Sequence, residues 1–244
     1  MPRLRGPAIS LPPSEERWSY LNEAIFGDPD QGGFQRAPME RALPWSWDKA
    51  FDRSAPLMLE IGFNRGRFIT ALAEQYPENN VVGIEIRKRF GIRLAQQLAT
   101  AGGPRNLRVI WGDGKVLMNA LFQPESIHDM FVTFPDPWWK KRHEKRRLVD
   151  TQFAAELAER LCVGGHVWVK SDVPMISEEI KEALISRPEL GSLTSFEQDD
   201  LPLTHREASC VKKGLPVYRF RLTRNDLPFT GYSEDSNEAS SSEE

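Results

Sequence analysis

The densest group of chemically useful side chains lies near the middle of the chain, where residues 134–147 read FPDPWWKKRHEKRR. Asp136 stands between two prolines, whose rings fix their own φ angles and restrict the residues before them. A carboxylate on so stiff a loop is suited to orienting a bound group. Trp138 and Trp139 follow directly and could stack a nucleobase; alternatively, at least one of them packs beneath the loop.

The second half of this stretch is strongly basic. Six bases and one acid lie between Lys140 and Arg147, a composition able to contact several phosphates, although a charge run can also be only a solvated face. The formal net charge of the chain is −3, but its last twenty residues hold six acids and no base, so the remainder carries +3. Because a local patch matters more for phosphate binding than the total charge, the stretch is interpreted as a polyanion site.

A glycine loop and two acids further indicate a nucleoside pocket. Residues 60–66, EIGFNRG, follow a short apolar run, and the glycine Gly62 would let the backbone turn tightly before a helix. Glu85 ends the next apolar run, where an acid bonds the ribose hydroxyls of an adenosine-type ligand. Asp113 follows the third run and is suitably placed for an adenine amino group. Alternatively, each acid caps the helix that follows it.

The residues of this loop favour S-adenosylmethionine over a dinucleotide. A pyrophosphate requires the GxGxxG pattern with bare backbone amides, whereas here Asn64 takes the place of the middle glycine. Glu60, just before the loop, would repel a pyrophosphate but attract the ammonium group of a methionine moiety. An NAD-dependent oxidoreductase is an alternative function for a similar sheet, but it would not explain the basic cluster.

Short apolar runs alternate with amphipathic stretches from about residue 56 onward, which predicts an α/β fold with a mostly parallel sheet covered by helices on both faces. The expected strands are residues 57–61, 81–86, 107–111, 128–134, 166–170, 193–196 and 217–222. The expected helices are residues 66–76, 87–100, 116–120, 149–161 and 176–186. Since ligands bind at the carboxyl ends of such strands, the loops considered above are expected to meet there.

Three segments are predicted: an N-terminal extension over residues 1–53, one domain over 54–224, and an acidic, serine-rich, disordered tail over 225–244. No apolar run is long enough to span a membrane, and the N-terminus lacks the apolar region of a secretory signal. The two cysteines, Cys162 and Cys210, lie far apart and the four histidines are scattered, so neither a disulfide nor a metal site is expected. A cytoplasmic protein is expected.

The stretch 134–147 closely resembles the signature of the tRNA (guanine-N7-)-methyltransferase family, roughly F-P-D-P-W-x-K-x-R-H-x-K-R-R, and matches it at every fixed position. A second resemblance is the family's T-x-x-E, followed by G-x-P-[IV]-Y-R, which looks like residues 204–207 and 214–219. The earlier residues 194–197 have the same T-x-x-E spacing but lie too far from that strand. The resemblance covers about residues 57–224.

The resemblance implies a Rossmann-like class I methyltransferase with a seven-stranded sheet. It implies transfer of the methyl group of S-adenosylmethionine to N7 of a guanosine in tRNA, guanosine 46 of the variable loop. Cofactor contacts would come from Glu60, Gly62, Glu85, Asp113 and Asp136. The tRNA would be contacted by Lys140, Asp172, Thr204, His205, Arg206 and Glu207.

The chemistry needs little from the protein beyond alignment. Guanine N7 carries an available lone pair, so no general base has to remove a proton, and Asp136 is the candidate catalytic residue as an orienting and electrostatic group. The alternative is a non-catalytic tRNA-binding protein that kept the fold, supported by Asn64 in the first loop. Such a protein would not bind S-adenosylmethionine.

Overall fold

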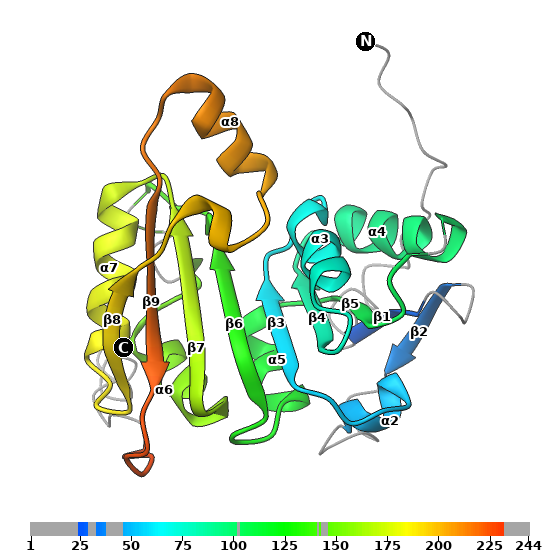
Figure 1. The fold of residues 1–244 in the computed structure, drawn as a ribbon, viewed down its shortest axis with the longest axis horizontal. Helices are drawn as coiled ribbons and strands as arrows, with labels where there is room; N and C mark the ends of the chain where they lie inside the picture. The colour runs from blue at the N-terminus through cyan, green and yellow to red at the C-terminus, as the bar shows by residue number, and fades with distance from the viewer. Residues whose placement is uncertain are drawn as a thin grey trace, which may run out of the picture.

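The computed structural model describes residues 24–28, 33–37, 46–101, 103–140, 142 and 146–231. Within these residues nine strands form one sheet in the order β2-β1-β5-β4-β3-β6-β7-β9-β8 (Figure 1). The strands β3 to β7 run parallel to one another. At one side β1 pairs antiparallel with β5 and β2, and at the other side β9 pairs antiparallel with β7 and β8. The predicted α/β fold with a mostly parallel sheet is confirmed.

Every predicted strand is present, with shifted boundaries for five of them. The strands that correspond to the seven predictions are β3 (Leu57–Ile61), β4 (Asn80–Glu85), β5 (Leu107–Trp111), β6 (Ile127–Thr133), β7 (Leu161–Ser171), β8 (Leu190–Ser195) and β9 (Tyr218–Arg224). The predicted helices are α3 (Arg67–Gln75), α4 (Lys88–Ala101), α5 (Gly114–Leu121), α6 (Thr151–Arg160) and α7 (Pro174–Ile185). The largest difference is β7, which begins five residues before the predicted His166 because apolar Leu161 continues the ladder with Ile127.

Among the described residues, two strands, two α-helices and the short 3₁₀ helix η5 (Gln198–Asp200) were not predicted. The strands β1 (Ala24–Asp28) and β2 (Gly33–Ala37) belong to the N-terminal segment, and β1 pairs with β5 through Ile25 and Trp111. The α-helices are α2 (Trp47–Phe51) and α8 (His205–Lys213). The N-terminal segment therefore adds two strands to the seven of the predicted domain; most of its other residues lie outside the described part of the chain.

Apolar side chains from the two faces of the sheet form two separate cores. Leu59 and Ile61 of β3 point to one face, which α5, α6 and α7 cover together with Trp47 of α2. Met58 of the same strand points to the opposite face, which α3 and α4 cover. This alternation follows from the two-residue period of a strand, and it leaves the carboxyl ends of the strands between the helical layers (Figure 1).

The connection from β8 to β9 carries α8 to the carboxyl edge of the sheet (Figure 1). After β9, residues 225–231, which the sequence assigns to the tail, lie against the domain: the backbone N–H of Thr230 donates to Glu189 at 2.7 Å and Phe229 stacks on Arg187. The rest of the predicted tail, residues 232–244, lies outside the described part. Among the described helices, none has the length and apolar character needed to cross a membrane.

Candidate functional site

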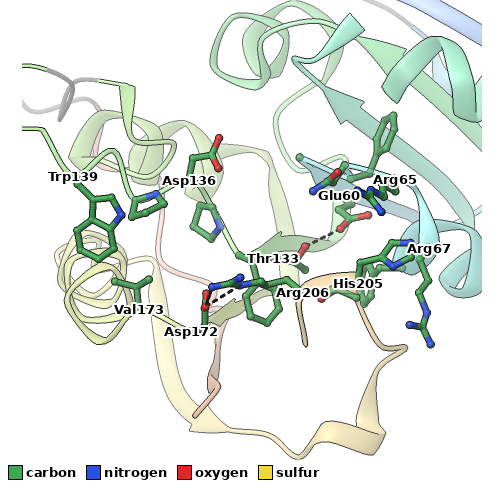
Figure 2. Close-up of a pocket in the computed structure, with 18 residues that line it drawn as sticks. Glu60, Arg65, Arg67, Thr133, Asp136, Trp139, Asp172, Val173, His205 and Arg206 are labelled. Atoms are coloured by element: carbon green, nitrogen blue, oxygen red, sulfur yellow. Dashed lines mark hydrogen bonds and ion pairs between the residues drawn. The ribbon is translucent and has the colours of Figure 1, made fainter. Parts of the chain in front are cut away.

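A cavity of about 310 Å³ lies at the carboxyl ends of β3, β6 and β7. Of the predicted site residues, it brings together Glu60, Gly62, Asp136, Asp172, Thr204, His205 and Arg206 (Figure 2). Glu85, Asp113, Lys140 and Glu207 are not part of its wall. The sequence therefore placed most of the cofactor and substrate candidates around one space, as expected for loops at one edge of a parallel sheet.

Glu60 is the most unusual group in this cavity. Its side chain is 1% exposed, one carboxylate oxygen accepts a hydrogen bond from Thr133 Oγ1 at 2.9 Å, and the other oxygen, Oε2, has no hydrogen-bond partner among the described residues. Burial raises the pKa of Glu60 to about 8. A buried acceptor without a partner is costly, so the cavity is chemically suited to a cationic donor, such as the ammonium of a methionine moiety.

The glycine loop leaves room for a ligand at the same place. Gly62 has φ +87° and an added Cβ there would meet nothing within 4 Å, so a ligand can approach the backbone. Asn64 has φ 52°. Asparagine tolerates this left-handed conformation better than most residues, which explains how the loop keeps its turn without the usual glycine. The residues present therefore fit S-adenosylmethionine.

Glu85 ties this loop to the next one. Its two carboxylate oxygens accept hydrogen bonds from the backbone N–H of Asn64 at 2.7 Å and of Arg87 at 2.8 Å. Burial nevertheless raises its pKa, and the two backbone bonds oppose that shift. A carboxylate offers about four acceptor positions, so Glu85 can hold the loop and still accept from ribose hydroxyls.

Glu85→Ala is expected to weaken S-adenosylmethionine binding by roughly 1.5–3 kcal/mol, because charge-assisted hydrogen bonds to ribose and support of the loop are lost together. Calorimetric titration measures this change. Glu78→Ala, which removes an exposed acid outside the cavity, serves as the control. Wild-type affinity in Glu85→Ala would exclude the ribose assignment.

Asp113 performs the alternative role that was considered for it. Its side chain accepts from the backbone N–H of Lys115 at 2.9 Å and caps α5. The preceding Gly112 donates to the backbone carbonyl of Glu85 at 3.1 Å, which keeps the ends of β4 and β5 together. A contact between Asp113 and adenine stays a prediction.

The loop of Asp136 is held in an unusual conformation. Phe134 and Trp138 have φ angles of 49° and 45°, a region that residues other than glycine rarely adopt. Arg147 fixes the loop, because its Nε donates to the backbone carbonyl of Pro137 at 3.1 Å and its Nη1 contacts Glu179 of α7 at 2.7 Å. Arg147 therefore ties the loop to α7.

The two tryptophans of the loop differ in their surroundings. Trp138 is half-buried and lies beneath the guanidinium of Arg146, 5.3 Å from the ring centre. Trp139 is 69% exposed and lines the cavity (Figure 2). Only Trp139 of this pair therefore offers a free ring face to a base.

Asp136 and Asp172 each lie beside an arginine. Arg87 contacts Asp136 at 2.6 Å in an exposed pair, and Arg206 Nε contacts Asp172 at 2.8 Å. The first pair is exposed on both sides and contributes little stability, so a ligand can replace Arg87 at small cost. The Asp172 side chain is only 12% exposed, so a ligand that displaces Arg206 has to supply a donor in its place. Arg87 is a site residue that the sequence did not suggest, although it follows Glu85 by only two positions.

The T-x-x-E segment plays a structural part at the N-terminus of α8. Thr204 Oγ1 accepts from the backbone N–H of Glu207 at 2.9 Å, which makes a capping box. Glu207 is fully buried and pairs with Lys170 at 2.8 Å and with Arg219 at 2.9 Å. A direct contact of Glu207 with tRNA stays a prediction, but its visible effect is to hold His205 and Arg206 at the cavity.

The basic stretch is described only in part. Lys140, Arg142 and Arg146 are exposed, while Arg147 is partly buried. Lys141 and Lys145 lie outside the described residues. No cluster of potential metal ligands occurs among the residues that the structure describes.

The affinity for S-adenosylmethionine is expected to depend on pH through the protonation of Glu60. Since its pKa of about 8 keeps it protonated at neutral pH, pairing with an ammonium requires loss of that proton. Affinity for S-adenosylmethionine should therefore rise between pH 6 and 7.5, with release of about one proton per bound molecule; above this range the ligand's own amino group begins to lose its charge. Calorimetry in buffers of different ionisation enthalpy measures the release. The same proton release in Glu60→Gln would contradict the assignment.

Comparison with known proteins agrees with this geometry. A family model described as a putative methyltransferase matches residues 54–220. The tRNA (guanine-N(7)-)-methyltransferase of Synechococcus sp. (strain JA-3-3Ab) is 35% identical over 74% of this chain and 78% of its own length. The enzyme of that name from Myxococcus xanthus (strain DK1622) is 36% identical over 74% and 89%, respectively.

Solved structures show the same fold at lower identity. The 16S rRNA methyltransferase KamB superposes with a TM-score of 0.55 at 14% identity, over 75% of this chain and 93% of that one. This likeness confirms the class I methyltransferase fold. The family model and the sequence relatives show that the chain belongs to the tRNA (guanine-N(7)-)-methyltransferase family.

Proposed function

We propose that the protein transfers the methyl group of S-adenosylmethionine to N7 of a guanosine in tRNA. One observation carries the proposal: a single cavity joins the buried carboxylate oxygen of Glu60, which has no partner among the described residues, to Asp136 and the exposed ring of Trp139. The first feature suits the amino-acid part of the cofactor, and the others suit a nucleobase. The sequence relatives are named for this reaction.

The residues act mainly by binding and aligning the reactants. The cofactor supplies an electrophilic methyl group on a positively charged sulfur. Glu60 holds the ammonium, and Gly62 lets the ligand lie against the backbone. Asp136 favours the positive charge that the purine gains, because preorganised charges act strongly in a confined site.

The target base is placed by residues on the other side of the cavity. Trp139 stacks against the purine, and Asp172, once released by Arg206, accepts from a donor on the guanine edge. No residue has to take a proton from N7. The exposed basic side chains of Lys140, Arg142 and Arg146 contact phosphates farther from the target base. These contacts affect the affinity for tRNA more than the rate of methyl transfer.

Two finer assignments belong to the same proposal. The resemblance described above implies guanosine 46 of the variable loop as the target, and the cytoplasm is the compartment expected from the sequence. The alternative function, tRNA binding without catalysis, rested on Asn64. Because Asn64 adopts the left-handed conformation that the loop needs, that support is lost.

The test is methylation of unmodified tRNA with S-adenosylmethionine labelled in the methyl group, followed by mapping of the alkali-labile site. Label at N7 of one guanosine is expected, and replacing guanosine 46 should remove it. Binding of the cofactor without label in the RNA, or label at another atom, would overturn the proposal.

A further inference from the structure

A second cavity, of about 650 Å³, adjoins the first one. It lies between α3 and α4 and is lined by Thr70, Gln97 and Pro104, among others. The two cavities share Arg65, Arg67 and His205. A strand whose base enters the first cavity can therefore continue into the second only by passing these three side chains.

The shared residues form a positively charged site. Arg65 and Arg67 are exposed, and within the described residues neither guanidinium makes an ion pair or a hydrogen bond. They flank Gly66, which begins α3 without a side-chain cap, and such a helix start also attracts anions. The pKa of His205 is lowered, first by partial burial and then by the charges of Arg65 and Arg67. Both arginines are therefore close enough to His205 for their charges to affect its protonation.

We propose that Arg65, Arg67 and His205 bind the phosphate that joins the target guanosine to its neighbour in the tRNA. The inference rests on the proposed function and adds the path of the RNA strand. Two arginines and an imidazole supply several donors to one phosphate, and arginine matches phosphate geometry especially well. The acid that lines the second cavity is Glu74. It lies near the opposite end of α3 from Arg67, so it does not take the place of the phosphate at this site.

The position of Arg67 favours a phosphate over the carboxylate of the cofactor. In Figure 2 the side chain of Arg67 extends away from Glu60 and lies beside His205, on the side of the cavity opposite Trp139. The methionine moiety is expected at Glu60, whereas the base is expected at Trp139. A strand crossing the cavity from Trp139 thus leaves it at Arg67 and His205.

The double variant Arg65→Ala/Arg67→Ala tests the site. Equilibrium binding of unmodified tRNA, measured by fluorescence anisotropy from 50 to 200 mM salt, should weaken by about tenfold or more at the lower salt. The logarithmic salt slope should flatten by about 0.7 to 0.9, the contribution of one phosphate contact. Affinity for S-adenosylmethionine and the melting temperature should stay at wild-type values. Arg93→Ala is the matched control, because Arg93 is an exposed arginine of α4 that lines neither cavity.

The outcomes separate this inference from the proposed function. If the double variant kept the salt slope of the wild-type protein, and the wild-type protein methylated tRNA, only the phosphate site would be overturned. A parallel loss of cofactor affinity would assign the arginines to the cofactor carboxylate instead. If wild-type protein binds tRNA through these arginines but forms no N7-methylguanosine, the phosphate site stands and the proposed reaction fails.

Discussion

Asp136→Ala is expected to lower the rate of methyl transfer at saturating tRNA and cofactor by about 10²-fold, the size typical of one preorganised electrostatic group. The carboxylate stands at the cavity on a loop fixed by Arg147, and its only polar partner among the described residues is the exposed Arg87. Its loss should therefore cost little stability. Single-turnover methylation and thermal unfolding measure the two effects.

Two further variants identify the physical origin of that loss. Asp136→Asn keeps the shape but removes the charge, so it should lose nearly as much activity if charge on the purine matters. Arg87→Ala breaks the same ion pair from the other side and should retain most of the rate. Asp199→Asn, which removes an exposed charge outside the cavity, is the control. Near-normal turnover in Asp136→Ala would remove this residue from the mechanism.

Glu207→Ala is expected to destabilise the protein by about 3–5 kcal/mol, the usual cost of breaking a buried ion pair. Glu207 is fully buried and faces Lys170 on β7 and Arg219 on β9. Its loss leaves two cations without their carboxylate and opens the capping box of α8. Urea denaturation in the absence of ligands measures the change.

The matching change on the other side should cost less. Lys170→Met leaves Glu207 paired with Arg219. It also removes a buried ammonium group whose pKa is lowered by burial, so the cost of burying that charge disappears. The double variant Lys170→Met/Glu207→Ala should therefore be less destabilised than the sum of the two single changes. If Glu207→Ala instead kept wild-type stability and lost only tRNA affinity, Glu207 would be a substrate contact and not a positioning residue.

Much of the fold could be predicted because its signals are local. The five parallel strands are short apolar runs bounded by amphipathic helices, and that pattern depends only on neighbouring residues. β1 and β2 were missed because AIFGD and GFQRA lack a clear two-residue alternation. Their place in the sheet comes from the pairing of β1 with the distant β5 and of β2 with β1. α8 was missed because only Glu207 and Cys210 are buried along it, so its apolar face is too narrow to be recognised.

The site could be predicted as a group of residues, but their partners could not. Chain order placed Glu60, Asp136 and Asp172 at the ends of parallel strands and hence around one cavity. Nothing in the sequence indicated that Arg87 meets Asp136 or that Glu207 meets Lys170, because those contacts join segments far apart in the chain. Arg65 and Arg67, which flank Gly66, were not predicted as site residues, because the sequence pattern there points to its glycines, Asn64 and the preceding acid.

The position of β9 also constrains how the protein can assemble during synthesis. Of the described strands β9 is the last to be made, yet it lies inside the sheet and pairs with β7 on one side and β8 on the other. Until Tyr218–Arg224 has been synthesised, β7 keeps an open edge and β8 has no partner among the described strands. Open edges of this kind invite pairing with other chains. The nascent protein therefore depends most on protection just before its final strand appears, and Arg219 within that strand completes the ion pair that holds α8 at the cavity.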